Sequence, residues 1–187
     1  MRYLSRVLPY ALPLAVLVAV PARAQTPASA PAAATIPVAA PEDVRSPDAI
    51  IAALYDVISG PAGQPRNWDR MRSLFAPGGR LIPAFPAPDG TVRARVWAVD
   101  DYIAQVGPNL DRNGFFEQEI SRTSETYGTI THAFSTYEAR RTPQDTKLLS
   151  RGINSIQLLN DGKRWYVVTV YWDSERPNNP IPQKYLR

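Results

Sequence analysis

The residues that most constrain the fold are 151–175, RGINSIQLLNDGKRWYVVTVYWDSE, which read as two β-strands joined by a tight turn. Asp161-Gly162 between two alternating apolar runs is a strong hairpin signal, because both central positions of such a turn take positive φ. With these two residues as the loop, Asn160 faces Lys163, and every other cross-strand pair follows from that register. The segment therefore predicts an antiparallel hairpin close to the C-terminus.

This register divides the side chains of the hairpin between two faces, since successive residues of a strand point to opposite sides of a sheet. One face is apolar near the turn and polar at the far end: Gly152, Asn154, Ile156, Leu158, Trp165, Val167, Thr169 and Tyr171. The other face is mixed and includes Gln157, Arg164, Tyr166, Val168, Val170 and Trp172. Asn154 and Thr169 either line a pocket or bond to neighbouring backbone inside the core. A slip of one residue would exchange the two faces.

The segments before the hairpin run from helices to strands. Ser46 and Pro47 suit the start of a helix, an apolar stripe at helical spacing follows, and Gly60 suits its end. The remaining patterns predict helices over 67–79 and 99–110, short strands within 80–98, and long strands over 115–128 and 129–141. Consecutive helices followed by antiparallel strands are typical of an α+β fold with the helices on one face of the sheet.

The chain resembles the nuclear transport factor 2-like superfamily, which includes SnoaL-like and ketosteroid-isomerase-like proteins. The resemblance covers residues 46 to about 175 and rests on SPDAIIAALYDVISG, NWDRMRSLFAPGGRLIP, VDDYIAQV, THAFSTYEAR and GKRWYVVTVYWDSE. It implies a cone-shaped, curved antiparallel sheet of four long strands plus short strands, wrapped around three N-terminal helices. It also implies an enclosed pocket and pairing of two copies through the outer sheet face.

The N-terminus predicts export. Arg2 and Arg6 form a basic start, residues 7–20 are apolar, and Ala22-Arg23-Ala24 offers small residues before a cleavage point. We predict a signal peptide over 1–24, a disordered Ala/Pro-rich linker over 25–41, the folded domain over 42–176 and a C-terminal tail over 177–187. The alternative is an uncleaved anchor. The expected location is the bacterial periplasm or the medium, with no stable membrane insertion after cleavage.

Charge and composition exclude several classes of function. The signal segment contains three of the 21 basic residues and none of the 17 acidic ones, so the mature chain has a net charge of +1. This balance gives no reason to expect nucleic-acid binding. The chain has no cysteine and a single histidine, so we predict no disulfide, no metal site and no cofactor.

The candidate pocket residues come from several predicted elements. His132 is the only histidine and the candidate general base, although a lone strand histidine is more often structural. Tyr55 and Trp68 lie on the apolar stripes of the first two helices, and they complete the predicted pocket set of Tyr55, Trp68, His132, Asn154, Thr169 and Tyr171.

The mixed face of the hairpin predicts an interface. Aromatic residues beside polar and basic ones are typical of protein–protein contacts, and the expected set is Gln157, Arg164, Tyr166, Val168 and Trp172. We expect a homodimer. The alternative is a monomer in which the tail folds back over this face, with Ile181, Tyr185 and Leu186 docked on it.

Two functions of different class follow. The first is an exported pocket domain that binds a small apolar or mixed-polarity ligand, or serves in assembly, without catalysis. The second is a cofactor-independent isomerase, dehydratase or cyclase acting on a small apolar substrate through His132, Tyr55 or Tyr171 together with pocket carboxyl groups, a hypothesis that rests on analogy of fold.

Overall fold

The computed structural model describes residues 36–187. The predicted signal peptide and most of the predicted linker lie outside these residues. The elements, in chain order, are α1 (Pro41–Val44), α2 (Pro47–Ile58), α3 (Trp68–Leu74), β1 (Phe75–Pro86), β2 (Val92–Ala94), β3 (Trp97–Ala98), α4 (Val99–Asn113), β4 (Phe116–Tyr127), β5 (Ile130–Arg140), β6 (Ser150–Asn160), β7 (Trp165–Ser174) and the short 3-10 helix η1 (Gln183–Tyr185).

The helices α2, α3 and α4 begin where the sequence predicts, whereas the short helices α1 and η1 were not predicted. The Ser46 hydroxyl accepts the Ala49 N–H at 3.1 Å at the start of α2, and the Asn67 side chain accepts the Arg70 N–H at 2.9 Å at the start of α3. The second helix is shorter than predicted, because the chain turns extended at Phe75 and continues directly into β1. Gly78, with φ near +79°, lies in the irregular part of this strand.

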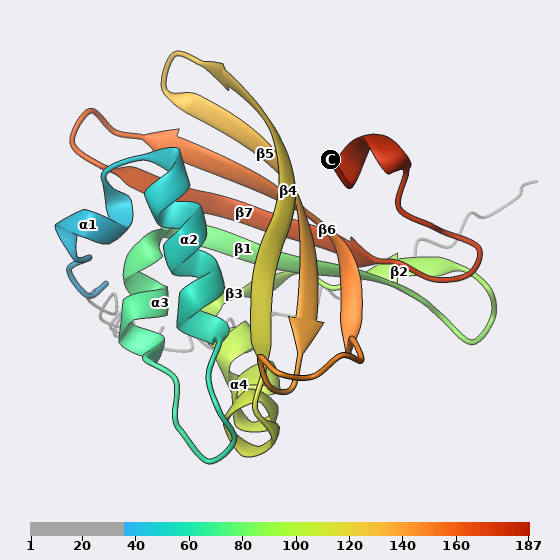
Figure 1. The fold of residues 1–187 in the computed structure, drawn as a ribbon. Helices are drawn as coiled ribbons and strands as arrows, with labels where there is room; N and C mark the ends of the chain where they lie inside the picture. The colour runs from blue at the N-terminus through green and yellow to red at the C-terminus, as the bar shows by residue number, and fades with distance from the viewer. Residues whose placement is uncertain (1–35) are drawn as a thin grey trace, which may run out of the picture. The chain divides into compact units, whose positions relative to one another are not determined.

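The strands form one curved sheet with the helices on its concave side (Figure 1). The strand order is β2-β1-β7-β6-β5-β4, with β3 paired to β1. The four long strands β4 to β7 are antiparallel, as predicted, whereas β1 pairs with β7 in parallel. The α+β fold class is confirmed.

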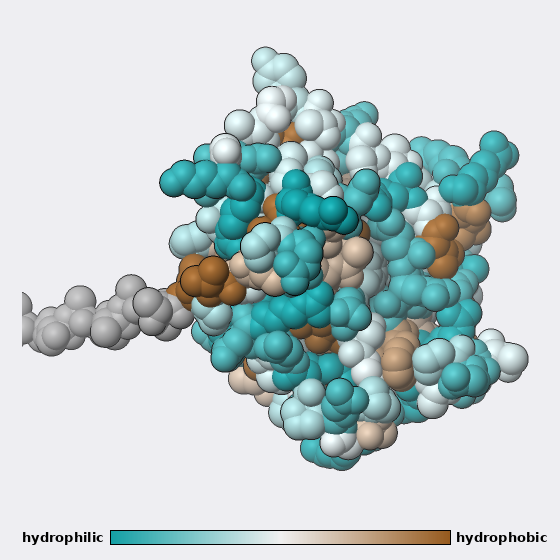
Figure 2. Space-filling model, turned by 60° about the vertical axis from the view of Figure 1, so that its left-hand side comes forward, coloured by the Kyte–Doolittle hydropathy of each residue, from teal (hydrophilic) through white to brown (hydrophobic). Residues whose placement is uncertain are grey.

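The core lies between α2, α3 and the concave face of the sheet. Its fully buried side chains come from both layers: Ile50, Ile51, Met71, Leu74, Phe75, Ile156, Leu158 and Val167. The side of the helices that faces away from the sheet is mainly hydrophilic, with apolar residues in separate small patches (Figure 2). No helix among residues 36–187 is long and apolar enough to cross a membrane.

The predicted hairpin exists, but its predicted register is wrong. Asn160 pairs with Trp165, so the loop has four residues, and the Asp161 carboxylate accepts the N–H groups of Lys163 and Arg164 at 2.8 and 2.9 Å. A β-bulge lies further on, where Gln157 pairs with Thr169 but Leu158 pairs with Val167. The extra residue, Val168, exchanges the two faces for the rest of β7.

The bulge therefore changes which residues share a side of the sheet. Val170 and Trp172 lie on the concave face with Asn154, while Thr169 and Tyr171 lie on the convex face with Gln157. The prediction had placed these two pairs the other way round. The faces of β6 itself are as predicted, because a shift of two residues leaves the alternation intact.

The C-terminal tail lies against the convex face. Thr136 donates its hydroxyl to the carbonyl of Tyr185 at 2.6 Å, and the Tyr185 ring lies 5.0 Å from that of Phe134. Ser121 donates to the carbonyl of Arg187. Figure 1 shows η1 beside the outer side of β4 and β5. The tail thus covers part of the face for which an interface was predicted.

A buried arginine joins the loop after α2 to the end of α4. The guanidinium of Arg66 donates to the carbonyl groups of Ile58, Gly60, Pro61, Gln64 and Leu110, and its side chain is only 3% exposed. The backbone N–H of Arg66 donates to Asp111 at 3.0 Å. Arg66 therefore donates to backbone carbonyl groups near the C-terminal end of α2 and near that of α4, which would otherwise lack donors.

Candidate functional site

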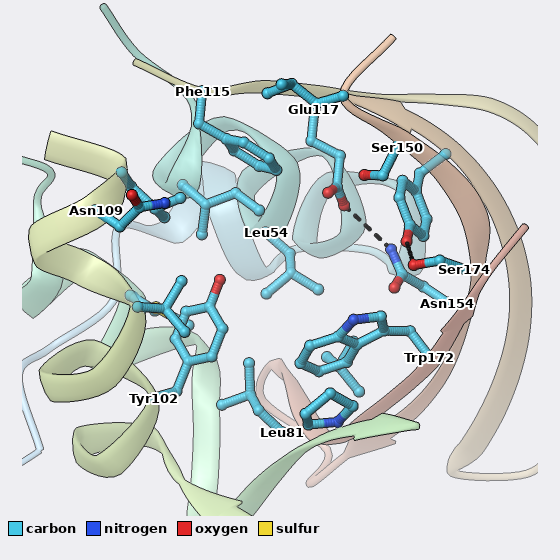
Figure 3. A pocket seen from close by; sticks show the side chains of 18 of the residues that line it. Leu54, Leu81, Tyr102, Asn109, Phe115, Glu117, Ser150, Asn154, Trp172 and Ser174 are labelled. Atoms are coloured by element: carbon cyan, nitrogen blue, oxygen red, sulfur yellow. Dashed lines mark hydrogen bonds between the residues drawn. The ribbon is translucent and has the colours of Figure 1, made fainter. Parts of the chain in front are cut away.

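A cavity of about 420 Å³ lies between α2, α4 and the concave face of the sheet (Figure 3). Its wall is mainly apolar and includes Leu54, Leu81, Trp97, Phe115, Val170 and Trp172. The polar groups that reach it come from different elements: Tyr102, Asn109, Glu117, Tyr137, Asn154 and Ser174. A mainly apolar cavity of this size with a few convergent polar groups has the usual form of a small-molecule site.

Glu117 is the carboxylate in this cavity. It lies near the start of β4, and the alternation of the strand points both Glu117 and Glu119 toward the concave side. The Glu117 carboxylate accepts a hydrogen bond from the side-chain amide of Asn154 at 3.3 Å. The backbone of Glu117 is fixed as well, because its N–H donates to the Ser59 hydroxyl at 3.0 Å.

A chain of buried hydrogen bonds orients Asn154. The same amide nitrogen donates to the Tyr55 hydroxyl at 3.1 Å, and this hydroxyl lies 2.6 Å from that of Ser135. Ser135 in turn donates to the carboxylate of Glu119. Arg122 pairs with Glu119 at 2.9 Å. This ion pair keeps the Glu119 carboxylate charged, so the last group in this series of hydrogen bonds is an acceptor.

The hydrogen bonds of this chain run in one direction. Since a carboxylate paired with Arg122 only accepts, Ser135 donates to it, Tyr55 donates to Ser135, and Asn154 donates to Tyr55. The two amide hydrogens of Asn154 are then directed at Tyr55 and Glu117, which leaves its carbonyl oxygen on the cavity side. The chain therefore fixes which polar group Asn154 offers to a ligand.

Burial changes the acidity of the site. Desolvation raises the pKa of the Glu117 carboxyl to about 7, although the hydrogen bond from Asn154 acts in the opposite direction. Burial also raises the pKa of the Tyr137 hydroxyl to about 12, partly offset by its hydrogen bond with Ser174, and raises that of Tyr102 well above its usual value. Near neutral pH, Glu117 is the group here that changes charge.

Three aromatic rings form one wall of the cavity. Tyr102 lies between Trp97 and Trp172, with ring centroids 6.2 and 6.4 Å apart and edge-to-face geometry in both pairs. Figure 3 shows the Tyr102 hydroxyl pointing into the cavity. The residue is only 7% exposed, so its ring is buried while its hydroxyl reaches the cavity.

The structure brings only part of the predicted site together. Asn154 lines the cavity and Tyr55 lies directly behind it. Trp68 does not line it: its ring packs against Gly107 so closely that a Cβ there would lie 3.0 Å from the indole. Trp68 thus joins α3 to α4, which is a structural role.

The other three predicted pocket residues lie on the opposite side of the sheet. His132 points to the convex face, where its Nε2 lies 3.2 Å from the Ser155 hydroxyl and its ring lies 6.0 Å from that of Phe134. Thr169 and Tyr171 are on the same face because of the β7 bulge. The candidate base is therefore separated from Asn154 and Glu117 by the sheet.

The predicted interface residues are also divided between the faces. Gln157 and Val168 lie on the convex side, and Arg164 stacks on the Tyr166 ring at 3.7 Å. Trp172 instead faces the cavity. Within residues 36–187, no group of three or more histidine, aspartate or glutamate side chains is arranged to hold a metal ion.

Sequence reasoning missed Glu117, Tyr102 and the inward position of Trp172. The available signal for Glu117 was alternation in FEQEISRTSETY, which places Glu117 and Glu119 on one face. A strand so rich in polar residues reads as solvent-exposed. Only the packing of α2 against β4, with α4 across the cavity, makes this position part of a cavity.

Comparisons with known proteins support the fold and leave the role open. No protein-family model and no curated protein matches the chain. A solved structure from Kribbella flavida is similar with a TM-score of 0.51 and 10% identity, covering 68% of this chain and 86% of that one.

Two further solved structures have names that describe their fold. A cystatin-like protein of unknown function from Nostoc punctiforme has a TM-score of 0.49 and 11% identity over 68% of this chain and 87% of that one. An NTF2-like protein of unknown function from Silicibacter pomeroyi has a TM-score of 0.47 and 12% identity, and the match covers 68% of this chain and 92% of that one. Identities this low concern the fold alone. The nuclear transport factor 2-like superfamily is what the sequence resemblance implies.

Proposed function

We propose that this chain is an exported small-molecule-binding domain whose ligand occupies the cavity beside Glu117. The observation that carries the proposal is the mainly apolar cavity of about 420 Å³, open on one side to solvent, with a single carboxyl group in its wall. Its polar groups are held in place by neighbouring side chains, so the site is formed before a ligand arrives.

A fragment screen by ligand-observed NMR tests this proposal. Val106 lines the cavity from α4, so Val106→Trp fills the cavity and should abolish binding of the hits. The matched control is Val168→Trp on the exposed convex face, which should leave the hits unchanged. Hits that bind both variants equally well, or a screen with none, would refute the proposal.

A second candidate function is acid–base catalysis on a small apolar substrate without a cofactor. The observation that favours it is the Glu117 carboxyl, whose pKa near 7 suits a group that gains and loses a proton at neutral pH. Glu117 therefore replaces His132 as the candidate general base, because His132 lies on the other face of the sheet. Glu117→Gln should then retain substrate binding but lose turnover, whereas a binding domain shows no turnover to lose.

Export is part of the proposal. The three-part segment over residues 1–24 supports cleavage after Ala24, and the mature chain would begin at Gln25. N-terminal sequencing of the protein recovered from the periplasm or medium tests it directly. A protein that begins at Met1 there, or remains in the cytoplasm, would contradict it.

A further inference from the structure

The charge of Glu117 has no counter-ion within the described part of the chain. Glu119, two residues further along β4, pairs with Arg122, and Glu138 and Glu175 pair with arginines as well. None of the ion pairs among residues 36–187 includes Glu117. Glu117 is half-buried. Withdrawing a carboxylate even partly from water without a cation is costly, and proteins normally pair such groups.

The surroundings of Glu117 supply hydrogen bonding and aromatic rings. Asn154 donates to its carboxylate, which favours the charged form, and the Trp97–Tyr102–Trp172 wall contributes aromatic surface to the same cavity. The negative face of an aromatic ring attracts cations, and desolvation strengthens this attraction. Both features favour a positively charged occupant.

The other charged and titratable groups around the cavity do not supply that positive charge inside it. Tyr55, Tyr102 and Tyr137 are neutral at pH 7, and Glu119 is already paired. Arg141 belongs to the lining but is solvent-exposed. Water and salt screen the charge of an exposed guanidinium far more than that of a buried group.

We propose that the cavity binds a small organic cation, a protonated amine or quaternary ammonium group attached to an apolar body. The cationic group lies beside the Glu117 carboxylate and the aromatic wall, and the apolar body fills the rest of the cavity. The Tyr102 hydroxyl and the Asn154 carbonyl oxygen remain to bond with further polar groups of the ligand. This inference rests on the proposed function that the cavity is a ligand site.

Binding of a cation must change the protonation of Glu117. In the free protein at pH 6 the carboxyl is mostly protonated, because its pKa is about 7. The bound cation favours the carboxylate, so the proton is released to the buffer as the complex forms. At pH 8.5 the carboxyl is already ionised and no proton is released. The affinity for a cation should therefore rise with pH until about pH 8.

Calorimetry with two matched probes tests the proposal on the mature chain. The probes are 4-phenylbutylamine, which is cationic at neutral pH, and 4-phenylbutan-1-ol, which is neutral and of the same length. We expect the amine to bind at least about tenfold more tightly, equivalent to about 1.4 kcal/mol. Glu117→Gln should remove this preference, whereas Glu125→Gln, an exposed change on the same strand, should retain it.

The outcomes separate this inference from the proposed function. Equal or tighter binding of the alcohol would overturn the cation inference and leave the cavity as a ligand site. If neither probe and no fragment binds, both the cation inference and the proposed ligand site are overturned. If Glu117→Gln does not fold, proton release decides: the wild type should release a proton with the amine at pH 6, measured in buffers of different ionisation enthalpy, and no release would refute the inference.

Discussion

Asn154 and Glu117 meet 3.3 Å apart in the wall of the cavity, although 37 residues separate them in the chain. The Asn154 amide stabilises the charged form of the carboxyl and so opposes the effect of burial. Replacing Asn154 by alanine should therefore raise the pKa of Glu117 further above 7. It should also destabilise the fold by about 1–3 kcal/mol, because Tyr55 and Glu117 lose a donor.

NMR titration of the Glu117 carboxyl and urea unfolding measure both effects of Asn154→Ala. Asn179→Ala is the control, since Asn179 bonds Asp173 at the exposed end of β7. An unchanged or lowered Glu117 pKa in Asn154→Ala would show that the amide does not interact with the carboxylate.

The Tyr55 hydroxyl joins Asn154 to Ser135 inside the protein. Tyr55→Phe removes a hydroxyl that makes two hydrogen bonds in a residue only 6% exposed, so we expect a loss of about 1–2 kcal/mol in unfolding free energy. Tyr127→Phe, at an 85% exposed position on β4, should change stability by less than about 0.5 kcal/mol. Equal effects of the two changes in urea unfolding would count against a buried chain of hydrogen bonds.

The half-buried Glu117 carboxyl should lower the stability of the fold as pH rises. The pKa of Glu117 is about 7 in the folded state against an ordinary value of 4.5, so the folded state binds the proton more tightly than the unfolded state. The penalty is absent below about pH 4.5, grows between pH 4.5 and 7, and is complete above pH 7. The full penalty amounts to about 3 kcal/mol.

Glu117→Gln provides the matched reference for this pH effect, because the variant keeps every other carboxyl group of the wild type. The unfolding free energy of the wild type, relative to that of Glu117→Gln, should fall by about 2–3 kcal/mol from pH 4.5 to 8. A difference between the two proteins that stays constant over this range would mean that Glu117 titrates normally.

Arg66 is the polar residue whose loss should harm the fold most. Five carbonyl oxygens accept from its guanidinium, and Arg66→Ala would leave them without a donor, so we expect a loss of at least about 3 kcal/mol. Arg66→Lys should recover little, because an ammonium group cannot reach so many acceptors. Arg112→Ala, an exposed change on α4, is the control in thermal unfolding. Near-wild-type stability of Arg66→Ala would be inconsistent with this role.

The convex face is the expected site of dimer formation. Val168 and Tyr171 are exposed there, whereas Trp172 points inward, so a test variant must avoid Trp172. If two copies pair through this face, Val168→Asp with Tyr171→Asp should give a folded monomer in sedimentation experiments. A wild type that sediments as a monomer at high micromolar concentration would instead favour the tail, docked through Tyr185, as the only cover of this face.

The sequence was sufficient to predict the fold class and the starts of α2, α3 and α4, because those features depend on local signals, whereas the short helices α1 and η1 were not predicted. Ser46, Pro47 and Asn67 act through neighbouring backbone groups, and the strands alternate visibly. The faces of β7 could not be predicted beyond Val168, since a bulge of one residue leaves no clear trace in the local pattern and reverses every later side chain. The same reversal misplaced Thr169, Tyr171 and Trp172.

The candidate site depends on contacts between distant segments, which explains why only Asn154 and Tyr55 were found. Glu117 becomes part of the cavity wall because α2 packs against β4 and α4 lies across the cavity. Its raised pKa follows from that packing and not from its sequence neighbours. Likewise His132 attracted attention as the only histidine, but strand alternation places it on the convex face. Residue type alone was a poor guide to position.

The most direct test follows the Glu117 carboxyl by NMR from pH 4 to 9, with and without 4-phenylbutylamine. We predict a titration midpoint near pH 7 in the free protein, caused by desolvation in the cavity, and a clear fall of that midpoint when the amine is bound. A midpoint near 4.5 that saturating amine leaves unchanged would contradict both the buried carboxyl and its place in a ligand site.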